Sequence, residues 1–219
     1  MKKEVDIKYS DLFWLFIIAS YVGLIFEGLY CLLKFGKWES HVVSVYGHFC
    51  IIYGVGIVFY YTLSHYIKKF NVIIRFLIYA ALGTLIELIC GLLLLYGLKM
   101  MSWSYENCFL NFMGLICFRM FIIWGILGFV FEKTNKYTDK FIKLTRKKVF
   151  NFIVPFFTVF MIINLSITTV AIVRWANRHN YNSKPTNKFT RYIDKKYNDK
   201  YMKKRFIEWY FVDDKKTSE

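Results

Sequence analysis

Four ionisable side chains lie inside long apolar stretches of the sequence: Glu27, His48, Glu87 and Arg119. A charge at the centre of a membrane-spanning helix costs ~2.5–3.5 kcal/mol on insertion scales, so each group needs a partner, a proton or water. We expect Arg119 to pair with one carboxylate, which leaves the other to bind a cation or a proton, or to pair with His48. The four residues form a candidate intramembrane polar site. A structural ion pair that only holds the helices together is an equal alternative, and packing is the commoner role for a lone histidine.

The depths of these four residues are expected to agree. If successive apolar stretches cross a membrane in alternating directions, all four side chains fall within several ångström of one layer, at ~1.5 Å of rise per residue. This layer is displaced toward the side that carries the first and third connections. Small residues lie one turn before each carboxylate, Gly23 before Glu27 and Gly83 before Glu87, and they allow close helix approach.

The elements that must hold this site are apolar runs of membrane-spanning length. Hydrophobic residues make up 57% of the 219 residues, and they occur in continuous blocks with the charges between them. This pattern predicts an all-α, polytopic transmembrane bundle of about five spans. The expected spans are residues 12–33, 42–63, 72–98, 112–131 and 152–173. We expect a transmembrane domain over residues 1–173 and a soluble, basic, helical tail over residues 174–219.

The connections differ in character. Residues 132–151 are basic with apolar residues interleaved, which indicates a helix on the membrane surface. In the third connection, Trp103 and Tyr105 suit the membrane interface, Asn111 could cap the fourth span, and Gly114 would permit close packing in its first turn. Lysine and arginine favour a cytoplasmic N-terminus, which places the basic tail outside. A basic tail on the outside conflicts with the tendency of positive segments to face the cytoplasm. A fifth segment that enters the membrane and returns to the same side would remove this conflict.

The formal charge of +15 collects beside the apolar runs. Thirteen of the 30 Lys and Arg residues lie in residues 174–216, and anionic lipid is their expected partner, rather than nucleic acid. The five cysteines form no CxxC and no Cys/His cluster at zinc spacing, so no metal site and no cofactor is expected. The sequence has no HExxH and no GxSxG motif, and we do not expect an enzyme.

Several motifs in order resemble one family. They are GHFCIIYGVG at residues 47–56, LIELICG at 85–91, WSYENCFLNFMGLIC at 103–117 and the tail segment at 185–204. Together they resemble the CmpB-like family (ABC-transporter type IV), a bacterial family of polytopic membrane proteins predicted to be ABC-transporter permeases. The residues that match its motifs are Gly47, Tyr53, Gly54, Gly56, Trp103, Tyr105, Asn111 and Gly114. His48, Ile51 and Ser104 depart from the pattern.

The resemblance implies a permease-type subunit of an ABC-type transporter, in a bacterial plasma membrane, with an unspecified substrate. The sequence contains no GxxxxGK[ST] phosphate loop, so this reading requires a separate ATPase subunit and favours homo-oligomerisation. The alternative is a non-transporting membrane scaffold or regulator that binds lipid or partner proteins through its basic segments.

Overall fold

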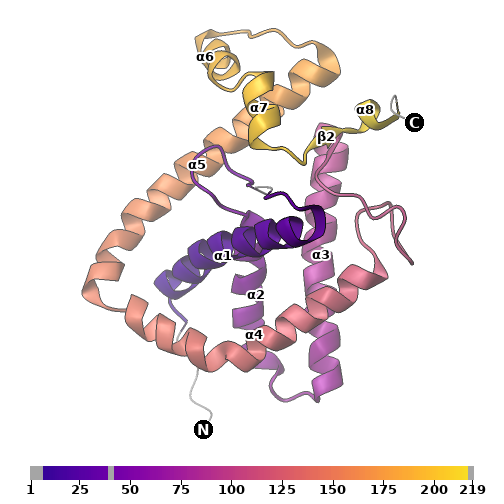
Figure 1. The fold of residues 1–219 in the computed structure, drawn as a ribbon. Coiled ribbons are helices and arrows are strands. Elements are labelled where there is room, and N and C mark those ends of the chain that lie inside the picture. The colour runs from indigo at the N-terminus through magenta and orange to yellow at the C-terminus, as the bar shows by residue number, and fades with distance from the viewer. Residues whose placement is uncertain (1–6, 39–41, 217–219) are drawn as a thin grey trace. The chain divides into compact units, whose positions relative to one another are not determined.

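The computed structural model describes residues 7–38 and 42–216, and helices dominate it (Figure 1). Five longer helices come first: α1 (Tyr9–Phe35), α2 (Ile51–Ile67), α3 (Val72–Leu98), α4 (Phe118–Thr145) and α5 (Lys148–Tyr181). Three short helices follow: α6 (Lys188–Lys196), α7 (Asp199–Arg205) and α8 (Val212–Lys216). Two strands of two residues each, β1 (Met100–Met101) and β2 (Tyr210–Phe211), form one antiparallel pair. The predicted all-α class is confirmed.

Among the described residues, three helices are long and apolar enough to cross a membrane: α1, α3 and α5. The apolar helix α2 has 17 residues and is shorter. The first, third and fifth predicted spans fall inside the three long helices, and the third has the predicted bounds of 72–98. Against the predicted count of about five spans, the described residues contain three candidate spans and one shorter apolar helix.

The second predicted span, residues 42–63, begins too early. Residues 42–50 are not helical, and α2 starts at Ile51. Gly47 has a φ of +73°, in the left-handed region that glycine tolerates and that ends regular structure. Apolar composition alone cannot distinguish this segment from a helix.

The fourth predicted span, residues 112–131, is also displaced. Residues 112–117 belong to the preceding connection, because α4 begins at Phe118 with Cys117 at its N-cap. The helix then continues to Thr145, through most of the basic segment in which a separate surface helix was expected. The apolar and the basic segments thus form one continuous helix.

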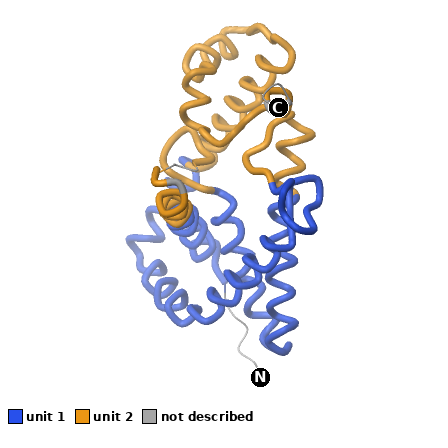
Figure 2. The backbone as a smooth tube through the Cα atoms, turned by 45° about the vertical axis from the view of Figure 1, so that its right-hand side comes forward, with its two compact units in different colours: residues 1–23, 51–88, 105–160 blue, residues 24–50, 89–104, 161–219 orange. Residues whose placement is uncertain are grey.

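The chain divides into two compact units (Figure 2). The first unit contains residues 1–23, 51–88 and 105–160. Its core is formed by residues from the long helices: Leu15, Tyr60, Tyr61, Ile67, Tyr79, Trp124, Phe131 and Ile142. The fully buried Asp11 accepts hydrogen bonds from Arg146, whose Nε lies 3.0 Å from Asp11 Oδ1. This ion pair between a buried aspartate and a partly exposed arginine joins the start of α1 to the turn between α4 and α5.

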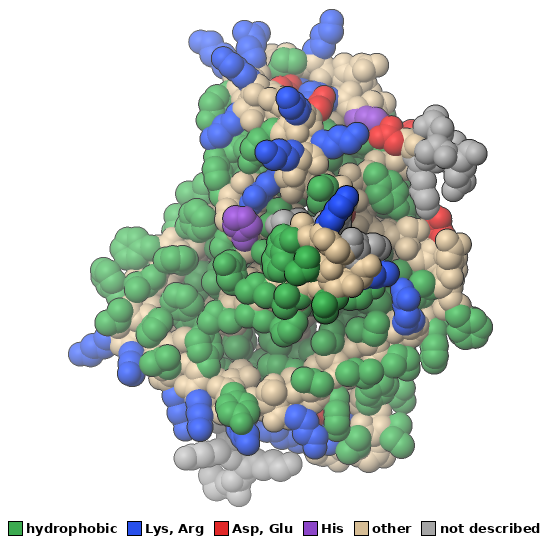
Figure 3. All heavy atoms as spheres, viewed as in Figure 1, with side chains coloured by type: hydrophobic (Ala, Val, Ile, Leu, Met, Phe, Trp, Pro, Cys, Tyr) green, Lys and Arg blue, Asp and Glu red, His purple; other side chains and the backbone are tan. Residues whose placement is uncertain are grey.

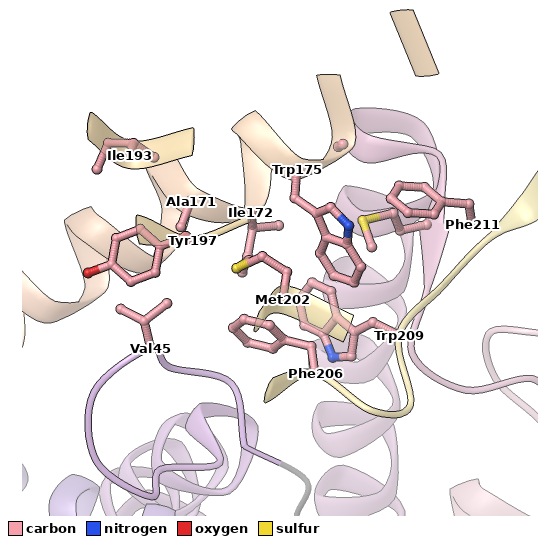
Figure 4. Packing of buried hydrophobic residues seen from close by; sticks show 12 residues of the cluster. Val45, Ala171, Ile172, Trp175, Ile193, Tyr197, Met202, Phe206, Trp209 and Phe211 are labelled. Carbon is pink, nitrogen blue, oxygen red and sulfur yellow. The ribbon is translucent and has the colours of Figure 1, made fainter. Parts of the chain in front are cut away.

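The second unit contains residues 24–50, 89–104 and 161–219. Its core gathers side chains from α5, from residues 42–50, from β1 and from the C-terminal tail (Figure 4): Val45, Met100, Ala171, Ile172, Trp175, Ala176, Ile193, Tyr197, Met202, Phe206, Trp209 and Phe211. The tail is therefore folded against the end of α5. The predicted domain division between residues 173 and 174 stays a prediction, and α5 continues through it to Tyr181.

The strand pairing limits the membrane topology. β1 lies in the connection after α3 and β2 lies in the tail, and a membrane cannot separate two hydrogen-bonded strands. The tail and the third connection therefore share one side. Whether the fifth segment crosses the membrane or enters and returns stays a prediction, because α4, which precedes it, is not among the three candidate spans. The cytoplasmic side stays a prediction, and Lys2 and Lys3, on which it partly rests, lie outside the described residues.

Candidate functional site

Glu87 is buried in α3, and its carboxylate has two donors within the first unit. The hydroxyl of Tyr105 donates to Oε1 at 2.8 Å, and the indole N–H of Trp124 donates to Oε2 at 2.9 Å. The glutamate side chain is only 3% exposed. Hydrogen bonds to both oxygens replace part of the hydration that the carboxylate loses on burial. We call these three residues the Glu87 cluster.

Close packing brings Trp124 to Glu87. Gly83 lies one turn before Glu87, and a Cβ atom at this position would lie 2.6 Å from Trp124 Cγ and from Tyr60 Oη. The Tyr60 hydroxyl lies 3.0 Å from the carbonyl oxygens of both Tyr79 and Trp124, so α2 supports the same contact. The glycine predicted to allow close helix approach does so, and the helix that approaches is α4.

A folded connection holds Tyr105 in place. Its backbone N–H donates to the Gly114 carbonyl at 2.8 Å. The Asn111 amide donates to the Glu106 and Cys108 carbonyls at 2.9 and 3.1 Å, and its Oδ1 accepts from Gly114 N. Gly114 has a φ of +68°, which a side chain would strain. Asn111 and Gly114 were expected at the start of the fourth span; both instead fold the connection that presents Tyr105.

Arg119 was expected to pair with Glu27 or Glu87, and the structure gives Glu87 the partners Tyr105 and Trp124. Arg119 is exposed in the first turn of α4, and within the described chain it forms no ion pair. Glu27 is partly buried and His48 is exposed, and both belong to the second unit. The layer predicted for all four residues spans both units and stays a prediction.

Sequence reasoning did not predict Trp124 as a hydrogen-bond donor to Glu87, and it predicted Tyr105 to be an anchor at the membrane interface. A usable signal was present. Trp and Tyr have apolar bodies and one polar atom each, and buried examples usually find a hydrogen-bond partner. An acid in an apolar helix is the natural acceptor.

A second arrangement surrounds residues 44–47, where the GHFCIIYGVG motif begins. The Asn164 side chain bonds both backbone groups of Tyr46, with its Oδ1 3.2 Å from Tyr46 N and its Nδ2 2.9 Å from Tyr46 O. Thr168 Oγ1 accepts from Val45 N at 3.0 Å. Helix α5 therefore supplies the partners that a regular helix would have supplied to this segment.

The tail binds the same segment. Arg205 donates to the carbonyls of Ser44, at 2.9 Å, and of Gly47, and the Tyr201 hydroxyl donates to the Val45 carbonyl at 3.3 Å. The Tyr46 hydroxyl accepts from Lys196 Nζ at 2.6 Å and lies 2.7 Å from the Tyr197 hydroxyl. The bond from Lys196, and then that with Tyr197, lowers the pKa of Tyr46. We call residues 44–47 the clamped segment.

The other motif residues pack against neighbours. Tyr53 lies against Gly23, and its ring centroid is 6.2 Å from that of Trp124. A Cβ at Gly54 would lie 2.2 Å from Ser20 Oγ, so α1 and α2 approach closely there. Gly56 is buried, and Trp103 is partly buried.

No group of three or more His, Cys, Asp or Glu side chains that could hold a metal ion occurs in the described part of the chain. None of the five cysteines, all of which lie in the described part of the chain, forms a disulfide bond. What the Glu87 cluster offers chemically is a buried carboxylate in an apolar helix, held by one donor from α4 and one from the connection before it.

A family model described as "Putative ABC-transporter type IV" (ABC_trans_CmpB) matches residues 14–169. The match includes the Glu87 cluster and the clamped segment but ends before the tail. No curated protein and no solved structure matches the chain. Because the family model covers well over half of the sequence, the chain belongs to the ABC_trans_CmpB family of ABC-transporter-related proteins.

Proposed function

We propose that the chain is the membrane-embedded, permease-type subunit of an ABC-type transporter and acts with a separate ATPase subunit. Family membership over residues 14–169 and three helices of spanning length support this role. The sequence lacks a phosphate-binding loop, so ATP hydrolysis would come from another chain. A bacterial plasma-membrane location, homo-oligomerisation and the lack of an enzymatic activity of its own are parts of the same proposal.

The observation that carries the proposal is the buried carboxylate of Glu87. An ionisable group inside an apolar helix is costly, and such groups commonly mark substrate or ion pathways. Its hydrogen bond to Tyr105 links α3 to a connecting segment, so a change at the connection can reach the carboxylate directly. In the proposed mechanism Glu87 lines the pathway. Glu27, His48 and Arg119 are assigned to this pathway on sequence grounds alone.

The first test is purification of the tagged chain from its native host in mild detergent, with identification of the chains that purify with it. We expect a stoichiometric ATPase subunit that carries a phosphate loop. Reconstitution of both chains in proteoliposomes should raise ATP hydrolysis above that of the ATPase alone. An intact, abundant chain without such a subunit, or without any effect on hydrolysis, would contradict the proposal.

The second test is Glu87→Gln in the reconstituted complex. A pathway carboxylate predicts normal abundance and assembly, with loss of the stimulated hydrolysis. Glu106→Gln, at an exposed glutamate of the third connection, serves as the matched control and should leave hydrolysis unchanged. Loss of the protein itself in Glu87→Gln would assign the carboxylate a structural role instead.

The scaffold alternative has its own observation, since the tail forms a folded, basic surface and lies beyond the family match. It predicts that Glu87 affects only stability and that neutralising tail lysines abolishes function. The two experiments above separate the two functions.

A further inference from the structure

The acidic side chains of α6 and of the start of α7 are paired with arginines of α5. Arg174 donates to Asp194 from Nε at 2.9 Å, and Arg178 Nη1 lies 2.6 Å from the same carboxylate. Arg178 Nη2 lies 2.7 Å from Asp199 Oδ1. Burial alone would raise the pKa of Asp194, but the hydrogen bonds from the two arginines outweigh it and lower the pKa. The carboxylates of Asp194 and Asp199 are thus paired with arginines of α5 and do not compensate the lysines of α6 and α7.

The basic side chains point outward instead (Figure 3). The exposed lysines and arginine over α6, α7 and the turns beside them are Lys184, Lys188, Arg191, Lys195, Lys196, Lys200, Lys203 and Lys204. Large apolar side chains are exposed among them, with Phe189 at 58% and Ile207 at 57%. The surface is therefore both positively charged and partly apolar.

One face of α6 concentrates this character. At 100° per residue, Lys188, Arg191, Tyr192 and Lys195 lie on one side of the helix, away from the buried Ile193. Tyr192 is 57% exposed. We call these four residues the α6 basic face.

The contacts of α6 fix its level along α5. Ile193 packs in the same cluster as Ala171, and Asp194 pairs with Arg174, the first charged residue after the apolar run of α5. The polar headgroup layer occupies about 5–8 Å outside the hydrocarbon on each side of a bilayer. Where α5 crosses a membrane, α6 therefore lies at headgroup depth.

We propose that the α6 basic face binds the headgroups of acidic phospholipids in the same membrane that α5 crosses. Lysine and arginine attract anionic headgroups, and exposed aromatic side chains such as Phe189 and Tyr192 suit the interfacial layer. Binding of nucleic acid would explain the positive charge of the α6 basic face, but it would not explain why α6 lies at the depth of the lipid headgroups. The inference does not depend on transport.

The test uses the full chain with p-benzoylphenylalanine in place of Phe189, whose aromatic ring it resembles. The protein is placed in nanodiscs of phosphatidylcholine with about 30% phosphatidylglycerol, an anionic lipid, and irradiated. Mass spectrometry of the intact protein then identifies the covalent lipid adduct. We expect the ratio of phosphatidylglycerol to phosphatidylcholine adducts to be about fivefold or more above the ratio of the two lipids in the nanodiscs, and a loss of this enrichment in about 0.5 M salt.

Substitutions that remove positive charge from α6 test whether the lipid binds at the α6 basic face. Each lysine or arginine near an anionic surface strengthens association about fivefold, so Lys188→Gln with Arg191→Gln and Lys195→Gln should return the adducts to the bulk lipid ratio. The matched control is the triple Lys136→Gln, Lys140→Gln and Lys143→Gln at exposed lysines of α4, which changes the net charge equally and should retain the enrichment.

Three outcomes would overturn the proposal. The adducts could follow the bulk lipid ratio in the parent protein, or the α6 triple variant could retain the enrichment while folding normally. A single-stranded oligonucleotide added to the nanodiscs could also be captured in place of lipid, which would assign the face to nucleic acid.

Discussion

Tyr105→Phe removes one hydroxyl from the Glu87 cluster and leaves the ring in place. The hydroxyl donates to Glu87 Oε1 at 2.8 Å, so the variant deprives a buried carboxylate of one donor. Trp124 still donates to the other oxygen at 2.9 Å. The substitution is therefore a local test of whether the connection before α4 stabilises the acid in α3.

The magnitude follows from the environment of that bond. Hydrogen bonds to charged groups in soluble proteins contribute about 1.5–3 kcal/mol, whereas those between membrane helices average about 0.6 and reach about 1.7 kcal/mol. Glu87 is buried and Tyr105 is partly exposed, so we expect a loss of about 1–2 kcal/mol. For a chain of this size that corresponds to a fall of roughly 2–8 °C in the unfolding temperature.

Thermal unfolding in detergent, at one fixed heating rate, measures this change. Tyr96→Phe is the control, since Tyr96 is 71% exposed on the same helix as Glu87. A double-mutant cycle with Glu87→Met, which removes the acceptor and keeps the length of the side chain, isolates the pairwise term, which should be about 1–2 kcal/mol. If Tyr105→Phe matched the control, or if the two substitutions were additive, the hydrogen bond would contribute nothing and the reasoning would be refuted.

Three further predictions concern other contacts. Gly83→Ala forces a Cβ to within 2.6 Å of side chains and should destabilise the protein by about 1–3 kcal/mol, whereas Gly97→Ala meets nothing within 4 Å and should be neutral in the same unfolding assay. Arg205→Ala removes the donor to the clamped segment and should make the buried thiol of Cys50 react faster with a maleimide, while alanine at an exposed lysine of α7 should not. The lowered pKa of Asp194 stabilises the fold above the unfolded-state pKa of about 3.9 and loses this contribution as the pH falls through the folded-state value. Stability measured between pH 6 and pH 3 should therefore fall less steeply in Asp194→Asn, and an unchanged slope would contradict the assignment.

Hydropathy correctly predicted the helices that form long, uninterrupted apolar runs in the sequence. Helix α3 has the expected bounds, because its apolar run is long enough to form one continuous helix from Val72 to Leu98. Part of the segment 42–50 is as apolar as α3. Backbone groups in this segment nevertheless bond to the side chains of Asn164 and Arg205, which lie far along the chain. A short stretch of sequence around residues 42–50 does not reveal these distant hydrogen-bond partners.

The site was predicted in part for the same reason. The cost of burying Glu87 follows from its position in an apolar run, and burial is observed. The pairing of Arg119 with one of the two carboxylates stays a prediction. Pairing by charge did not anticipate that the packing of Gly83 against Trp124 brings an indole to Glu87. Which donor reaches a buried acid depends on how closely two helices approach, and a single sequence does not specify that distance.

The clamped segment also constrains the order in which the protein can mature. It is synthesised early, yet its partners on α5 follow 118 and 123 residues later, and Arg205 follows 161 residues later. During translation its backbone groups therefore lack these partners until α5 and then α7 have emerged. A ribosome stalled before α7 would leave this segment without Arg205, so the hydrogen bonds of this early loop are completed only after α7 has been made.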